Sequence, residues 1–70
     1  MTAGQLMEAL EKLVDKEKLS AVIESLGDMC HEKCEHIRTN WPNDGALAST
    51  YDDFGSRLWT LAQRAKDAGV

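Results

Sequence analysis

The side chains best suited to metal binding lie in one short segment, Cys30-His31-Glu32-Lys33-Cys34-Glu35-His36. Cys thiolates and His nitrogens are common zinc ligands, and this segment contains all the Cys and His of the chain. Structural zinc sites usually draw a second ligand pair from elsewhere, and this chain has none to offer. On a helix, Cys30 and Cys34 share one face, whereas His31 and His36 project well away from it. The pattern therefore favours small core cysteines, surface histidines and no cofactor.

Two other interpretations of the cysteine pair stay open. Cys30 and Cys34 could form half of a metal site that a second subunit completes, like the metal sites shared between helices of a bundle. The protein would then be a metal-dependent oligomer. A disulfide within the helix is less favoured, because the two side chains diverge and the expected cytoplasmic location is reducing.

Catalytic groupings are scarce in this sequence. Asp52 and Asp53 are adjacent, so they point in different directions on a helix, and Asp53 is placed to pair with Arg57 four residues on. The chain has no Gly-rich phosphate loop, no His-Glu-x-x-His motif and no nucleophile with an evident base. We therefore expect a protein that is not an enzyme.

An acidic stripe follows the central part of the chain and consists of Glu24, Asp28, Glu32 and Glu35. On a helix these carboxylates lie opposite the apolar face. They could form a docking surface for a partner protein with a basic surface. The alternative is an ordinary solvated face, which has a similar composition and is the favoured interpretation.

Trp59 stands apart from the apolar stripe of its own predicted helix, and the small residues Ala48, Gly55 and Ala62 share its side. A large aromatic among small side chains offers a close-packing surface, either for the first helix or for another chain. Gly55 in mid-helix costs about 1 kcal/mol relative to Ala, which close approach of another backbone would offset. The candidate interface residues are Trp59, Gly55, Ala62, Trp41 and Met29.

Three helices are expected to position these side chains, over residues 3–14, 20–39 and 44–68. Thr2 and Gln5 match a capping box at the start of the first helix. The segment Asn-Trp-Pro-Asn-Asp-Gly, residues 40–45, ends the second helix, and Asn43 or Asp44 would cap the third. The third helix is expected to bury Leu47, Tyr51, Phe54, Leu58, Leu61 and Ala65, and Gly69 to end it. The prediction is an all-α, single-domain protein, with an antiparallel helical hairpin and a short N-terminal helix.

The apolar residues of the central helix fall within an arc of roughly 140° at ~100° per residue. They are Leu19, Val22, Ile23, Leu26, Met29, Cys30, Cys34, Ile37 and Trp41. The stripe of the first helix, carried forward at the same rate, points the opposite way. One unbroken rod would have no single face to bury, so we predict a break within residues 15–19, with Asp15 or Ser20 as the new cap.

Length and composition limit the function classes further. A chain of 70 residues hides only about 60% of its unfolded surface, so self-association is an expected source of stability. Its net charge of −4 and the absence of a basic run disfavour nucleic-acid binding. No apolar run reaches the ~20 residues of a membrane span. No signal peptide is evident, and a soluble, cytoplasmic protein is expected.

Residues 34–41, Cys-Glu-His-Ile-Arg-Thr-Asn-Trp, precede an acidic turn and an Ala-rich helix with Trp59. This pattern, over residues 19–65, resembles short uncharacterised helical proteins of bacteria and their phages. The resemblance implies no activity, cofactor or site. It does suggest a small phage-type inhibitor or adaptor that docks on a larger host protein. The leading hypothesis is a non-enzymatic interaction module, a homodimer in which two helical hairpins pair.

Overall fold

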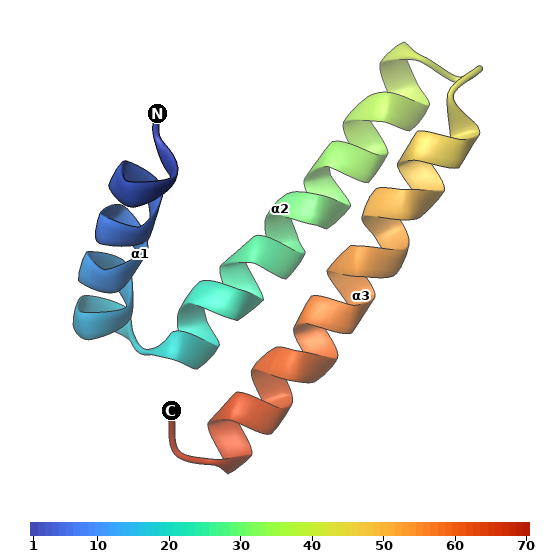
Figure 1. Ribbon diagram of the computed structural model, residues 1–70. Helices are drawn as coiled ribbons and strands as arrows, with labels where there is room; N and C mark the ends of the chain where they lie inside the picture. Colours follow the sequence, from blue (N-terminus) through green and yellow to red (C-terminus); the bar gives the residue numbers. More distant parts are fainter.

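The computed structural model of the 70-residue chain contains three α-helices and no strand. Helix α1 spans Ala3–Glu17, α2 spans Leu19–Asn40 and α3 spans Gly45–Asp67. Helices α2 and α3 lie side by side and antiparallel as a long hairpin, and α1 lies beside the first half of α2 (Figure 1). The predicted all-α hairpin with a short N-terminal helix is confirmed. No helix has the length and apolar composition needed to cross a membrane.

Local signals set the outer ends of the helical chain as predicted. The Thr2 hydroxyl accepts a hydrogen bond from the Gln5 backbone N–H, and the Gln5 side chain accepts one from the Thr2 N–H, which completes the capping box. Gly69 adopts a φ of 84° after the last turn of α3. The N–H groups of Gly69 and Val70 donate to the carbonyls of Lys66 and Ala65. This is a Schellman ending, which needs a residue that tolerates the left-handed region.

The break between α1 and α2 is a single residue, Lys18, with φ 105° and ψ 150°. It lies within the predicted range, although α1 continues to Glu17 instead of ending at residue 14. The predicted caps at Asp15 and Ser20 are wrong, because Lys18 takes both cap positions and its side chain makes no capping hydrogen bond. The chain therefore changes direction through backbone geometry that glycine adopts far more readily than lysine.

Apart from Ile37, the residues buried between α2 and α3 are small. The buried members are Ser20, Gly27, Cys30, Cys34 and Ile37 on α2, and Ala48, Gly55, Ala62 and Ala65 on α3. A Cβ added at Gly27 would lie 3.1 Å from the carbonyl oxygen of Gly55, so the two backbones approach closely there. The expected burial of Leu47, Phe54 and Leu61 is wrong, since they stay 44%, 56% and 47% exposed. If these large side chains had faced α2, they would have held the two helices further apart.

The fold leaves an unusually large surface open to solvent. Helix α1 contains no buried residue and makes few contacts with α2. The chain exposes 5329 Å², whereas a compact monomer of 7.8 kDa is expected to expose about 4,400 Å². The radius of gyration is 14.0 Å against about 11 Å for a compact domain of this length. The molecule is therefore a small, extended helical protein with many exposed hydrophobic residues.

Candidate interaction surface

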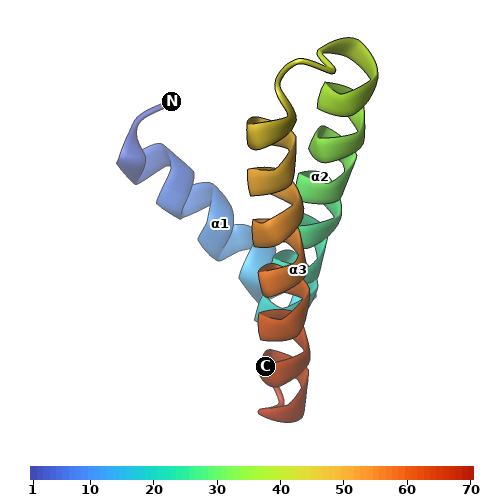
Figure 2. The ribbon, with the colours of Figure 1, turned by 90° about the vertical axis from the view of Figure 1, so that its right-hand side faces the viewer.

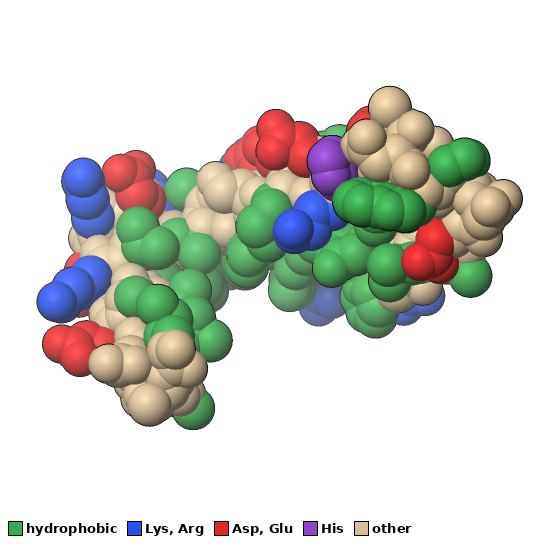
Figure 3. Space-filling model, turned by 90° about the horizontal axis from the view of Figure 1, so that it is seen from above, with side chains coloured by type: hydrophobic (Ala, Val, Ile, Leu, Met, Phe, Trp, Pro, Cys, Tyr) green, Lys and Arg blue, Asp and Glu red, His purple; other side chains and the backbone are tan.

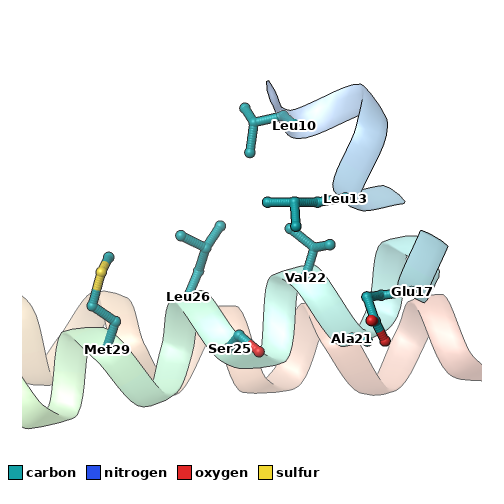
Figure 4. Close-up of a pocket in the computed structure, with 8 residues that line it drawn as sticks. All are labelled: Leu10, Leu13, Glu17, Ala21, Val22, Ser25, Leu26 and Met29. Atoms are coloured by element: carbon teal, nitrogen blue, oxygen red, sulfur yellow. The ribbon is translucent and has the colours of Figure 1, made fainter. Parts of the chain in front are cut away.

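An apolar groove of about 320 Å³ lies between α1 and α2 (Figure 4). Six of its eight lining residues are hydrophobic. Helix α1 contributes Leu10, Leu13 and Glu17, and helix α2 contributes Ala21, Val22, Ser25, Leu26 and Met29. Leu13 and Val22 point toward each other across it, near the end where the two helices join (Figure 4). We call this feature the α1–α2 groove.

The groove exists because α1 and α2 diverge from the Lys18 junction. Their apolar faces therefore meet only near that junction, and α1 projects to one side of the hairpin (Figure 2). Leu10 and Leu26 are each 37% exposed although they line the groove, and Met7, one turn before Leu10, is 63% exposed. The apolar periodicity of both helices was visible in the sequence. The angle between α1 and α2, which leaves these side chains exposed, was not predictable from the sequence, because it depends on the backbone conformation of Lys18 alone.

A second apolar strip runs along α3 and consists of Leu47, Phe54 and Leu61, spaced seven residues apart. At ~100° per residue, this α3 strip lies roughly opposite Trp59 on the helix. Figure 3 shows hydrophobic side chains on the side of the hairpin toward which α1 projects, and a group of acidic side chains on the opposite side. We call the α1–α2 groove and the α3 strip together the apolar face.

Trp59, the leading candidate interface residue, packs on α2. Its indole Nε1 donates a hydrogen bond of 2.9 Å to Asp28 Oδ1, and the ring covers Gly27. The small residues Gly55 and Ala62 are also covered by α2, and not by α1 or a second chain. Trp59 itself stays 45% exposed at the edge of this contact.

The remaining interface candidates, Met29 and Trp41, lie on α2 and directly after it. Met29 lines the α1–α2 groove and is 43% exposed. Trp41 ends α2 and is 57% exposed, with its ring edge-on to His36 at a centroid distance of 5.3 Å. The five candidates therefore do not form one patch. Only Met29 belongs to the apolar face.

His31 is not the surface residue that its helical position suggested. Its ring stacks on Trp59 at a centroid distance of 4.1 Å, and its Nδ1 lies 3.2 Å from Asp52 Oδ1. The other nitrogen, Nε2, is buried without a hydrogen-bond partner, and a Cβ on Gly55 would lie only 2.7 Å from it. The missing side chain at Gly55 thus provides the space that His31 fills. His36 is exposed, as expected, and its backbone carbonyl accepts from the Asn40 side chain.

The acidic stripe divides into two pairs with different surroundings. Glu24 forms an ion pair of 2.9 Å with Lys66, and Asp28 accepts the hydrogen bond from Trp59, so both are tied to α3. Glu32 and Glu35 are exposed and have no ion-pair or hydrogen-bond partner from another helix. Only the second pair is fully available to a basic partner.

The structure provides no cluster of three His, Cys, Asp or Glu side chains that could hold a metal ion. Cys30 and Cys34 are free thiols, buried in the α2–α3 contact, with Cys34 only 2% exposed. The predicted core position of the cysteines is confirmed. A metal site shared with a second subunit would require the hairpin to open. The predicted ion pair of Asp53 with Arg57 is present at 3.0 Å.

No protein-family profile, curated protein or solved structure matches this chain.

Proposed function

We propose that this chain is a non-enzymatic protein-interaction module that forms a homodimer by burying its apolar face. The observation that supports the proposal most is the exposed area. The excess over a compact monomer is about 900 Å², close to the ~800 Å² that each partner buries in a stable interface. A chain of this size buries only a small core when it folds alone, so burying this surface against a partner would stabilise the fold.

The arrangement of the helices supports the same proposal. Stable domains usually pack two layers of secondary structure around one core. Here the Cα atoms extend 39 × 31 × 14 Å, so the chain is flat. Two copies stacked on their apolar faces would form the missing second layer, with the hairpins paired as four helices. The acidic residues would stay on the outer side.

An adaptor role through the acidic stripe has less support. Half of its carboxylates already bind α3, and their charge is partly neutralised by Lys66. A metal-dependent oligomer built on Cys30 and Cys34 has still less support, because both thiols lie in the hairpin contact. If the purified protein contains a bound metal and loses its oligomeric state in a chelator, that alternative replaces ours.

Sedimentation equilibrium over a range of protein concentrations tests the proposal. We expect a species of twice the chain mass of 7.8 kDa. Phe54→Asp, which places a charge in the α3 strip, should weaken the dimer at least about tenfold. Ser56→Asp adds the same charge to an exposed position of α3 outside the strip and should leave the dimer intact. A monomer at hundreds of micromolar, or equal effects of the two variants, would contradict the proposal.

A further inference from the structure

We infer that the α1–α2 groove is filled by α1 of a second copy, so that each chain inserts its N-terminal helix into the groove of the other. This inference rests on the proposed homodimer and specifies its geometry. The first argument is that α1 has no core of its own. None of its residues is buried, and Leu6, Met7 and Leu13 are 50%, 63% and 48% exposed. A 15-residue helix is marginal in water without a packed face, so α1 requires a partner surface.

The groove has the chemistry of such a partner surface. Val22, Leu26 and Met29 present apolar side chains to it, and its α1 wall adds Leu10 and Leu13. An amphipathic helix binds a groove of this kind through apolar residues three and four positions apart. Leu6, Leu10 and Leu13 have this spacing. The same helix thus supplies a wall of the groove and the segment that fits into it, as a two-fold symmetric interface requires.

Charge favours an antiparallel pairing of the two α1 helices. The one charged residue of the groove is Glu17, at the closed end beside the α1–α2 junction. An antiparallel α1 from the second copy would place its N-terminal turn there. That turn contains no acidic residue, and the N-terminal end of a helix attracts negative charge. Glu8, Glu11 and Lys12 lie on the outer side of α1, so they would stay in water.

Disulfide trapping between differently tagged copies tests this reciprocal insertion. Each copy contains Cys30→Ala and Cys34→Ala and a single new cysteine, and circular dichroism checks its helicity. Copies with Leu10→Cys are mixed with copies with Met29→Cys and oxidised. We expect a cross-linked heterodimer. The matched control uses Glu8→Cys, which lies on the outer side of α1, in place of Leu10→Cys, and the heterodimer should then be lost.

A second measurement needs no substitution. Isotope-filtered NMR on a mixture of labelled and unlabelled chains detects contacts between copies only. We expect methyl contacts from Leu10 and Leu13 of one copy to Leu26 and Met29 of the other. A dimer in sedimentation that lacks both the cross-link and these contacts would overturn the reciprocal insertion of α1 and leave the homodimer proposal in place. A monomer would overturn both proposals.

Discussion

The indole of Trp59 donates a hydrogen bond of 2.9 Å to Asp28 Oδ1, and its ring occupies the place that a Cβ at Gly27 would take and lies against the His31 imidazole. This arrangement joins the middle of α2 to the middle of α3 on the acidic side of the hairpin. It needs a glycine under the ring, an acceptor beside it and space at Gly55 for the histidine. Helix α2 therefore positions Trp59. The opposite side of α3, which contains the α3 strip, has no neighbour.

The hydrogen bond between Trp59 and Asp28 should contribute to the stability of the hairpin. Trp59→Phe removes the N–H donor, and we expect it to lower the free energy of unfolding, through this hydrogen bond alone, by about 0.5–1.5 kcal/mol. Asp28→Ala should cost a similar amount, whereas Asp28→Asn keeps an acceptor oxygen and should cost less. Urea unfolding of the single and double variants gives the coupling energy. Additive losses in the double variant Trp59→Phe/Asp28→Ala would show that the hydrogen bond contributes nothing.

Gly27→Ala tests the close approach of the two helices. In most helix interiors this change stabilises by about 1 kcal/mol. Here the new Cβ would lie 2.7 Å from Trp59 Nε1 and 3.1 Å from the Gly55 carbonyl oxygen. We expect a net loss of about 1–2 kcal/mol, because overpacking of a close contact outweighs the propensity gain. Gly4→Ala is the control, since its Cβ would meet only the Thr2 hydroxyl, at 4.0 Å. Equal melting temperatures for the two variants would contradict the close approach.

The number of helices and the capping box of α1 were predictable because they depend on local signals. Thr2 and Gln5, residues 40–45 and Gly69 each act within a few positions of the chain. The choice of packing face was not predictable in the same way. Apolar periodicity pointed to Leu47, Phe54 and Leu61 on α3, whereas the hairpin uses Ala48, Gly55 and Ala62. Small side chains let the two backbones approach closely and leave space for Trp59 and His31. A single sequence does not show whether this close packing stabilises the hairpin more than burial of the leucines would.

The position of His31 shows the same effect on α2. Helical spacing places it away from the apolar arc, but α3 packs toward the side of Ser20 and Gly27, so the ring becomes part of the contact. The break near Lys18 was predictable from the phase of the two stripes. The open angle beyond it was not, and the α1–α2 groove depends on that angle. The candidate interaction surface thus follows from tertiary geometry, although most of its residues are recognisable as apolar in the sequence.

Lys18→Gly should stabilise the protein. Lys18 holds φ 105° and ψ 150°, a region that is essentially reserved for glycine and costs another residue about 1–3 kcal/mol. Glycine removes that strain and loses up to about 1 kcal/mol through the entropy of the unfolded chain. We therefore expect a net gain of about 1 kcal/mol in the free energy of unfolding measured with urea. Lys18→Ala removes the same side chain but keeps the Cβ, so it should stay near the original stability. Similar values for both variants would contradict strain at this junction.

Charge reversal should separate the two halves of the acidic stripe. Glu24→Lys with Asp28→Lys removes the ion pair to Lys66 and the acceptor for Trp59. Exposed ion pairs contribute less than about 1 kcal/mol, so most of the expected loss of stability comes from the Trp59 contact. Removal of both interactions should lower the melting temperature clearly. Glu32→Lys with Glu35→Lys makes the same change in net charge at exposed positions and should leave the melting temperature nearly unchanged. Equal melting temperatures for the two double variants would contradict the structural role of Glu24 and Asp28. A test for a basic partner protein therefore belongs on Glu32 and Glu35, where lost capture reports binding and not unfolding.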